Sequence, residues 1–207
     1  MDYIKDGAEI YRRSFAIIRQ EADLSSIPSD LEKVVVRMIH ASGSTDLPSA
    51  VAYSKDWVET GRKALNQGAP ILCDTMMVAN GITKARLPAS NQVICTLKDK
   101  AVPQLAQEIN NTRTAAAINL WKNDLEGAVV VIGNAPTALF YLLEKIDQGW
   151  PKPAALLGLP VGFIGAVESK QELSENPRDI PFLTLHGRRG GSAIAVAALN
   201  ALAQEQE

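Results

Sequence analysis

His40 stands in the segment RMIHASG, residues 37–43, whose final glycine suits the end of a helix. On a helical wheel that starts at Leu31, the apolar residues gather on one side and His40 falls on the opposite side. The imidazole is therefore expected to point away from the core of its own helix. A protonated histidine in the last turn is favoured by about 0.3–1 kcal/mol, because the helix dipole is negative there. This position suits a general acid, and it also fits a surface histidine with no role.

Two glycine-rich segments could bind an anion or could simply form tight turns. HGRRGGSAIA leads from an expected strand into a helix, so its backbone N–H groups could cradle an anion beside Arg188 and Arg189. It lacks the spacing and the lysine of a phosphate-binding P-loop. GLPVGFIGA fails the dinucleotide fingerprint, because Gly158, Gly162 and Gly165 do not have the required spacing. Turn sterics that require glycine explain both segments equally well.

Arg113 is expected at the start of an Ala-rich helix, where a cation opposes the helix dipole. This misfit favours an anionic partner, although a solvated surface arginine is the ordinary case. In VIGNAPTAL, Asn134 is expected to cap a helix and Pro136 to lie in its first turn, which is a structural role. The GxSxG motif is absent, and neither histidine has a serine or cysteine partner recognisable from the sequence. A nucleophile system is therefore not expected.

Composition excludes several other classes of protein. The formal net charge of −2, without a long run of Lys or Arg, argues against nucleic-acid binding. No signal-peptide pattern and no membrane-spanning apolar stretch occur, so a cytoplasmic protein with no membrane partner is expected. Cys73 and Cys95 lie in apolar, strand-like segments, where cysteine usually acts as a small buried hydrophobe. Without a Cys/His cluster, no metal site is expected.

The elements that must position these residues follow from the pattern of apolar positions. Helices are expected over 4–22, from Ser29 to about Ala41, and from Pro48 to Gly68, with Ser29 and Glu32 forming a capping box. Strands are then expected in APILCDT, NQVICTL, GAVVVIG, PAALLGL and PFLTLHG, alternating with helices near 103–122, 135–147, 168–175 and 191–204. This pattern predicts a single α/β domain over 1–207: N-terminal helices to about residue 67, then a three-layer core from about 68, with a mainly parallel sheet covered on both faces. Its binding crevice is expected at the carboxyl ends of the strands.

Six segments in this order resemble the precorrin-8X methylmutase family, also called precorrin isomerase, of cobalamin biosynthesis. They are IYRRSFAIIRQE, RMIHASG, CDTMMVANGI, VIGNAPTAL, PVGFIGAVESK and GRRGGSAIA. The resemblance covers nearly the whole chain. It implies an enzyme that moves a methyl group from C11 to C12 of a tetrapyrrole, either precorrin-8X or cobalt-precorrin-8, without a cofactor. It also implies a homodimer with active sites near the subunit interface, and it leaves open direct transfer of the product to the next pathway enzyme.

The same resemblance assigns roles to residues. The histidine of the family's R-x-x-H motif matches His40, which becomes the expected general acid. Protonation of the macrocycle near the migrating methyl group would drive the accompanying tautomer change, and imidazole can supply that proton near neutral pH. The substrate is edged with carboxylates, so arginines and hydroxyls are expected around an apolar floor. The matched substrate-contacting residues are Arg13, Ser14, Thr83 and Arg113, with Arg188 and Arg189 added from the glycine-rich loop.

Two other classes of function remain open at this point. A tetrapyrrole carrier would bind the same ligand without isomerising it. A nucleotide-binding α/β enzyme would be stabilised by nucleotides, although the expected fingerprints are missing.

Overall fold

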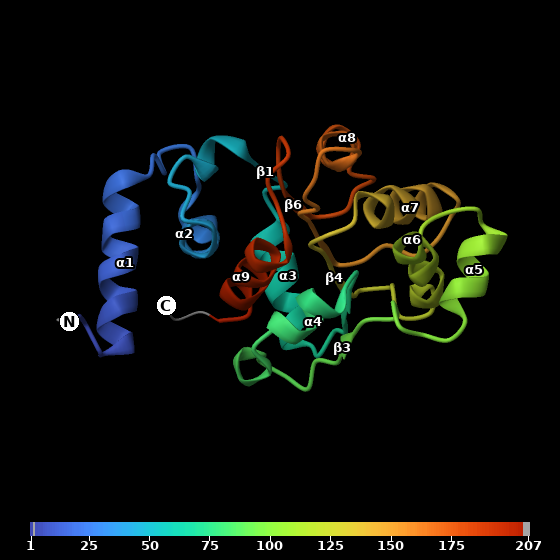
Figure 1. Cartoon of the computed structure of the whole chain (residues 1–207), viewed down its shortest axis with the longest axis horizontal. Coiled ribbons are helices and arrows are strands. Elements are labelled where there is room, and N and C mark those ends of the chain that lie inside the picture. Colours follow the sequence, from blue (N-terminus) through green and yellow to red (C-terminus); the bar gives the residue numbers. More distant parts are fainter. Residues whose placement is uncertain (2, 205–207) are drawn as a thin grey trace.

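The computed structural model describes residues 1 and 3–204, which form a six-stranded sheet with helices on both faces (Figure 1). The strand order is β1-β6-β5-β4-β2-β3, and every neighbouring pair is parallel except β1 and β6. The predicted α/β class with a mainly parallel sheet is confirmed. The strands are β1 (Val51–Tyr53), β2 (Ile71–Cys73), β3 (Val93–Ile94), β4 (Val129–Ile132), β5 (Ala155–Gly158) and β6 (Phe182–Leu185).

Each of the five predicted strand segments contains one strand, whereas β1 was not predicted. The single helix expected from Pro48 to Gly68 is wrong, because a short 3-10 helix (Leu47–Ala50) leads into β1 before α3 begins at Trp57. β1 pairs antiparallel with β6, with Val51 opposite Leu185. Backbone hydrogen bonds to the sheet edge therefore decide the structure of this short segment against its helical pattern.

The helices are α1 (Gly7–Glu21), α2 (Ser29–Ser42), α3 (Trp57–Asn66), α4 (Met76–Gly81), α5 (Val102–Glu108), α6 (Arg113–Ile118), α7 (Pro136–Asp147), α8 (Ala166–Glu175) and α9 (Ser192–Leu202). Short 3-10 helices cover Lys84–Arg86 and Asn119–Trp121. The helix predicted over 103–122 is divided into α5 and α6, because Asn110 takes a left-handed conformation with φ of 48°. Asparagine adopts this conformation more readily than most residues, so the Asn110–Asn111 pair ends the first helix.

The predicted capping box at the start of α2 does not form. The helix begins at Ser29 as expected, but Pro28 is the capping residue and no side chain caps the helix. Glu32 instead accepts a hydrogen bond from Arg19 Nε at 2.8 Å, which joins α2 to α1. Because Glu32 pairs with Arg19 of α1, its side chain does not form the capping-box hydrogen bond.

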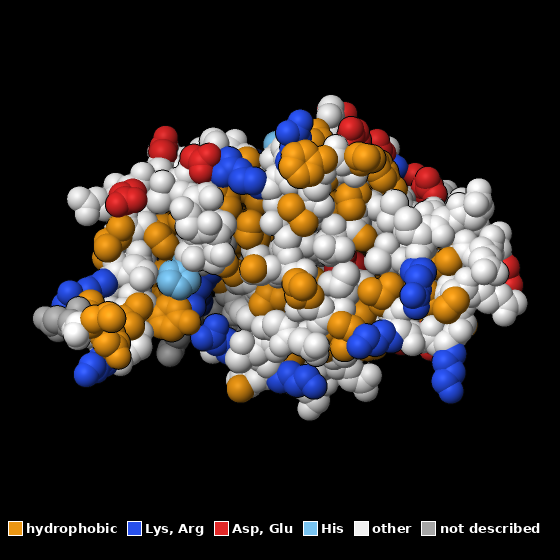
Figure 2. Space-filling view, in the orientation of Figure 1, with side chains coloured by type: hydrophobic (Ala, Val, Ile, Leu, Met, Phe, Trp, Pro, Cys, Tyr) orange, Lys and Arg blue, Asp and Glu red, His pale blue; other side chains and the backbone are white. Residues whose placement is uncertain are grey.

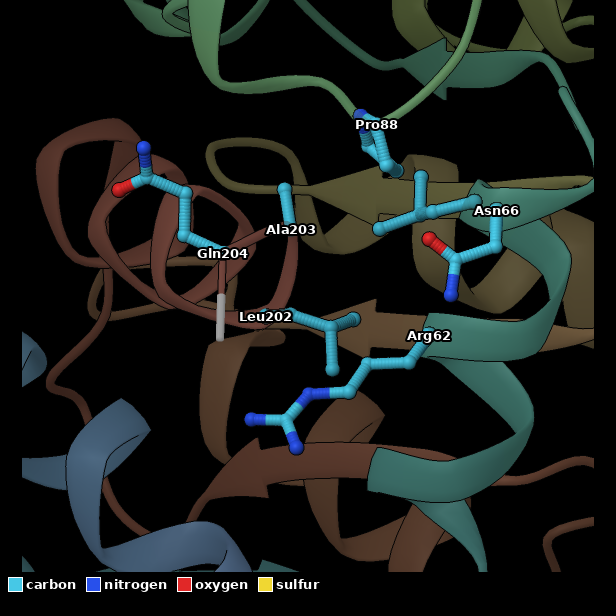
Figure 3. Close-up of a pocket in the computed structure, with 7 residues that line it drawn as sticks. Arg62, Asn66, Pro88, Leu202, Ala203 and Gln204 are labelled. Atoms are coloured by element: carbon cyan, nitrogen blue, oxygen red, sulfur yellow. The ribbon is translucent and has the colours of Figure 1, made fainter. Parts of the chain in front are cut away.

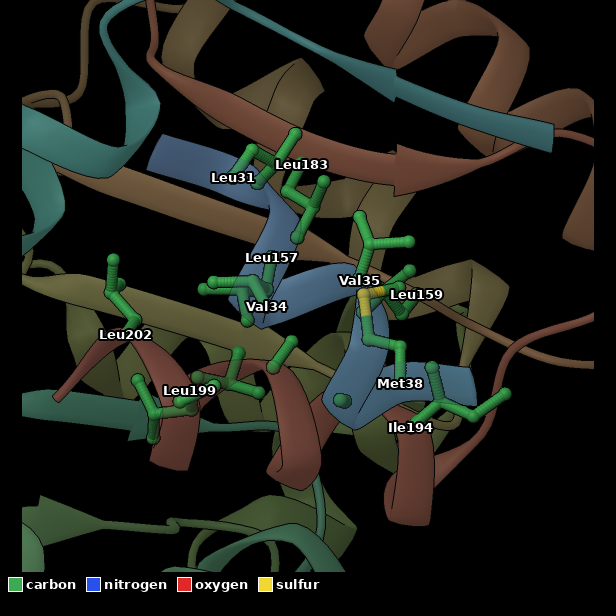
Figure 4. Close-up of a cluster of buried hydrophobic side chains, with 14 of the residues drawn as sticks. Leu31, Val34, Val35, Met38, Leu157, Leu159, Leu183, Ile194, Leu199 and Leu202 are labelled. Atoms are coloured by element: carbon green, nitrogen blue, oxygen red, sulfur yellow. The ribbon is translucent and has the colours of Figure 1, made fainter. Parts of the chain in front are cut away.

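The core fills both faces of the sheet, as alternating strand residues require. Leu157 of β5 belongs to the cluster that includes α2 and α9, while its neighbour Leu156 packs with α7 on the other face. Figure 4 shows the first cluster, in which the predicted α2 stripe lies against Leu157, Leu183 and Leu199. This stripe is at most 1% exposed and consists of Leu31, Val34, Val35 and Met38. The packing of α2 fixes the direction in which His40 points.

Candidate active site

His40 lies in the last turn of α2 and its side chain is exposed, whereas the adjacent Met38 and Ile39 are at most 1% exposed. The helix ends at Gly43, whose left-handed φ of 67° and N–H bond to the Ile39 carbonyl (2.8 Å) form the stop expected from the sequence. The expectation that His40 points away from its helix core is therefore confirmed.

Two aromatic rings of α1 form a wall beside this histidine. The His40 ring centroid lies 5.4 Å from that of Tyr11 and 5.4 Å from that of Phe15, which it meets edge-on at 73°. The Arg37 guanidinium also lies over both rings, 4.6 Å from the Phe15 centroid. The imidazole is thus held by ring contacts, with a permanent positive charge packed on the same rings.

A cavity of about 270 Å³ opens beside His40. Thr83 and Arg86 also line it, together with small residues of α9. The buried Asn200 of α9 organises this part of the lining, since its Oδ1 accepts the Thr83 N–H at 3.0 Å and its Nδ2 donates to the Gly81 carbonyl at 3.4 Å. The structure therefore brings His40 and Thr83 together, and Asn200 and Arg86 are lining residues that the sequence reading missed.

Arg13 and Ser14 lie nearby on α1 but do not line this cavity. The exposed Arg13 donates to Glu9 at 2.6 Å, and Arg12 donates to the same carboxylate at 2.7 Å. These hydrogen bonds lower the pKa of Glu9 to about 2. Arg13 is consequently paired with Glu9 through its Nε atom.

Arg113 is the first residue of α6, is exposed, and lines a separate open hollow of about 730 Å³. Thr112 caps this helix by accepting the Ala115 N–H at 3.2 Å. The hydroxyls of Thr112, Thr114 and Thr137 lie 2.8–3.2 Å from one another beside it. This hollow shares no lining residue with the His40 cavity, so within one chain Arg113 and His40 occupy different surfaces.

The glycine-rich loop 187–191 carries Arg188 and Arg189. The Arg189 guanidinium donates two hydrogen bonds of 2.8 Å to the Asp46 carboxylate, and this lowers the pKa of Asp46. Arg188 lies over the Phe163 ring, 5.1 Å from its centroid. The Gly191 N–H donates to the Leu159 carbonyl at 2.9 Å, so this amide is not available to an anion. The two arginine side chains are therefore the cationic groups of this loop, and one of them already contacts a carboxylate, that of Asp46.

Comparison with known proteins identifies the family of this chain. The family model described as precorrin-8X methylmutase (CbiC) matches residues 9–205. The chain belongs to the precorrin-8X methylmutase family. It is therefore an enzyme, an isomerase of cobalamin biosynthesis, and this prediction is confirmed.

Individual relatives of this methylmutase match it over 95% or more of its length. A precorrin-8X methylmutase from Pseudomonas aeruginosa is 58% identical over 207 residues, which is 100% of both chains. A cobalt-precorrin-8 methylmutase from Leptospira interrogans is 37% identical over 203 residues, covering 95% of this chain and 92% of the relative. The crystal structure of precorrin-8X methyl mutase from Thermus thermophilus superimposes with a TM-score of 0.86 at 40% identity, covering 95% of each chain.

The methylmutase also contains a buried carboxylate that the sequence reading missed. Asp74, 2% exposed, follows β2 and accepts the N–H groups of Gly133, Asn134 and Ala135 at 2.9–3.0 Å. Burial raises the pKa of Asp74, and the three amide donors oppose that shift. The predicted N-cap role of Asn134 is therefore wrong: Ala135 is the capping residue of α7, and Asp74 satisfies the amides before it. The sequence feature that could have indicated Asp74 is an acidic residue directly after an apolar strand, in the segment CDT.

Other features of the methylmutase lie away from His40. A cavity of about 400 Å³ between α3 and the end of α9, drawn in Figure 3, is lined by Arg62, Asn66 and Pro88 among others, and by no predicted site residue.

Residues 1 and 3–204 contain no group of three or more His, Cys, Asp or Glu side chains that could hold a metal ion. None of the helices in the described part of the chain is long and apolar enough to cross a membrane.

Proposed function

We propose that this methylmutase moves the methyl group from C11 to C12 of metal-free precorrin-8X to give hydrogenobyrinic acid, with His40 as general acid. The observation that carries the proposal is the placement of His40. Its imidazole is exposed and lines a cavity that Thr83 and small apolar residues of α9 also line. A flat macrocycle edge can lie against such small residues and meet a proton donor at one side.

The chemistry needs only proton movement from the protein. The C11–CH₃ bond breaks and the C12–CH₃ bond forms within one macrocycle, so substrate and product contain the same atoms. An imidazolium beside the ring can protonate a ring nitrogen or carbon, which withdraws electron density from the migrating group. Imidazole titrates near neutral pH and can recover the proton afterwards.

The surrounding polar residues would hold the substrate's carboxylates. A charge-assisted hydrogen bond is worth about 1.5–3 kcal/mol when it is shielded from water. Two of the candidate arginines, Arg13 and Arg189, pair with carboxylates of the chain itself, which supports a role for their guanidinium groups in binding an acidic partner. The proposed substrate-binding residues are Arg13, Ser14, Thr83, Arg113, Arg188 and Arg189.

The comparisons favour the metal-free substrate. The Pseudomonas aeruginosa relative named for precorrin-8X is 58% identical to this chain, whereas the Leptospira interrogans relative named for cobalt-precorrin-8 is 37% identical. Since the two substrates differ by an ion at the centre of the macrocycle, discrimination falls to the residues around the ring. The higher identity with the first relative supports the same substrate here.

We also propose that the active form is a homodimer joined near α1. The His40 cavity of about 270 Å³ falls below the roughly 300–1,000 Å³ of ordinary small-molecule sites, and a tetrapyrrole is a large ligand. Ile10 and Ile17, seven residues apart on one side of α1, are 42% and 52% exposed. Figure 2 shows hydrophobic side chains gathered over this end of the molecule. A second copy seated on α1 would cover them and enlarge the site.

An absorbance time course tests the proposed reaction, because methyl migration changes the conjugated system. Purified protein mixed with metal-free precorrin-8X should give the hydrogenobyrinic-acid spectrum. A bound but unchanged spectrum would contradict the proposal. Repetition with cobalt-precorrin-8 would then show whether the metal form is the substrate or the protein is a carrier, and retention of the product through gel filtration would favour its direct transfer to the next enzyme. A thermal-shift screen with nucleotides tests the alternative of a nucleotide-binding enzyme, and we expect it to show no stabilisation.

A further inference from the structure

Lys170 is a fully buried cation that the reaction described above does not use. It lies in α8, and its exposed fraction is 0%. An ammonium group carries three donors and is costly to remove from water unless it is paired. No carboxylate forms an ion pair with Lys170 within residues 1 and 3–204. Its hydrogen-bond partner is the main-chain carbonyl of Arg189, at 2.5 Å.

The base of this lysine is held rigidly by its helix. A Cβ atom built on Gly158 at the end of β5 would lie 2.5 Å from Leu173, so α8 packs directly on the strand. The adjacent Ser169 is 0% exposed and donates to the Ala166 carbonyl at 3.3 Å. Lys170 therefore extends from a fixed support toward the 187–191 loop.

The loop itself is fitted closely to the backbone after β5. A Cβ atom on Gly190 would lie 2.4 Å from the carbonyl oxygens of Leu159 and Pro160, so only glycine fits there. The Gly162 N–H donates to the Arg188 carbonyl at 3.3 Å. Together with Lys170, these contacts hold the main chain at two consecutive residues, Arg188 and Arg189. The side chains of those two arginines remain directed to other partners, Phe163 and Asp46.

Packing alone does not explain an ammonium group at this position. An apolar side chain of similar length would fill the space without the loss of hydration, and such replacements of buried charges are often neutral or stabilising. What the ammonium adds is a charge-assisted bond to one particular carbonyl, and a third positive charge behind two arginines.

We propose that Lys170 is a positioning residue, which holds the Arg189 carbonyl so that the 187–191 loop presents Arg188 and Arg189 to carboxylates of the substrate. The inference rests on the proposed function, in which those arginines bind substrate. Burial also lowers the pKa of Lys170 to about 8, as expected for an ammonium group that lacks an acidic partner.

The test compares Lys170→Met with Lys100→Met, an exposed lysine outside the site that serves as the matched control. Steady-state turnover of precorrin-8X by Lys170→Met should show KM raised about tenfold, with kcat within about twofold of wild type, because His40 is untouched. Lys170→Gln keeps an N–H donor, so its KM should lie between that of wild type and that of Lys170→Met. Unchanged KM in a folded Lys170→Met protein overturns the proposal, as does a loss of kcat alone.

A second measurement separates this inference from the proposed function. Amide hydrogen exchange of residues 187–191 in the ligand-free protein should be faster in Lys170→Met than in wild type, and unchanged in Lys100→Met. Equal exchange in all three proteins overturns the positioning role even when the wild type is fully active. An inactive wild type would instead contradict the proposed function, while the exchange data would still decide whether Lys170 holds the loop. Lys170→Gln serves for the exchange experiment if Lys170→Met does not fold.

Discussion

The imidazole of His40 meets the edge of the Phe15 ring at a centroid distance of 5.4 Å and an angle of 73°. Phe15 is 4% exposed and anchors α1, while His40 is exposed at the end of α2. One ring thus belongs to the core and the other to the surface. This contact between two helices orients the imidazole plane relative to the cavity, as the proposed role of His40 as a proton donor requires.

Replacement of His40 by alanine should abolish turnover and spare binding. A positioned acid–base group contributes about 10²–10⁴-fold to rate, so kcat should fall by at least two orders of magnitude. Affinity for hydrogenobyrinic acid should stay within a few-fold, because the carboxylate-binding residues are unchanged. His186→Ala makes the same replacement at the other histidine and should leave kcat as it is. An active His40→Ala protein would remove His40 from the mechanism.

Asn200 and Thr83 should separate structural support from substrate contact. Asn200→Ala leaves the Thr83 N–H without its 3.0 Å acceptor and should cost about 1–3 kcal/mol of stability, together with a lower kcat/KM. Thr83→Val removes an exposed hydroxyl and should leave the melting temperature unchanged while raising KM. Chemical denaturation and initial rates on both variants provide the measurement. Equal effects of the two changes on stability would contradict this division of roles.

Arg113 should act on binding without affecting the fold. Arg113→Ala is expected to raise KM by about 10- to 100-fold, the loss of one charge-assisted bond, with the melting temperature unchanged because the side chain is exposed. Lys100→Ala removes another exposed cation, one that has no assigned contact with the substrate. It should leave KM near the wild-type value. An equal rise in both variants would indicate a general electrostatic effect and not a specific contact.

Much of the fold could be predicted because apolar runs determine which segments lie inside the sheet. β4 and β5 are apolar throughout, so all four residues of each strand are stable only when they are buried inside the sheet. β1 could not be recognised in this way, since its three residues are half-buried and it pairs only at an edge. Its structure depends on β6, more than 125 residues later in the chain, a contact that no local pattern encodes.

In the site too, features set by local helix geometry could be predicted, whereas features set by contacts between distant residues could not. The direction of His40 follows from the position of one residue on one helix, so the sequence predicted it. The neighbourhood of Thr83 depends on Asn200, 117 residues further on, whose amide joins α9 to the segment after α4. Asp74 is similar, because the three N–H groups that donate to its carboxylate belong to the loop after β4, the strand next to β2 in the sheet. Buried polar groups find partners across the fold, and sequence spacing does not show which ones.

The proposed dimer predicts that a charge on α1 separates the subunits. Ile17→Asp places a carboxylate on the exposed apolar side of the helix, away from Phe15 and Ile18, and should leave each chain folded. Light scattering should give the mass of two chains for wild type and of one chain for the variant. Turnover should fall with the loss of the dimer. Gln104→Asp, which places a carboxylate at an exposed position of α5 and not of α1, is the control and should remain dimeric.

Lys170 should make the free energy of unfolding rise with pH above about pH 8, because burial lowers its pKa. Its pKa is about 8 in the folded chain and near the ordinary 10.5 when unfolded. Between these values the unfolded chain binds more protons than the folded chain, so the free energy of unfolding should rise with pH. Urea denaturation of wild type and Lys170→Met at pH 7, 8, 9 and 10 isolates this effect, because the other titrations are common to both proteins. The difference should be constant below about pH 8 and then shift toward wild type, by at most about 1.4 kcal/mol per pH unit. A difference that stays constant to pH 10 would mean that burial does not lower the pKa of Lys170.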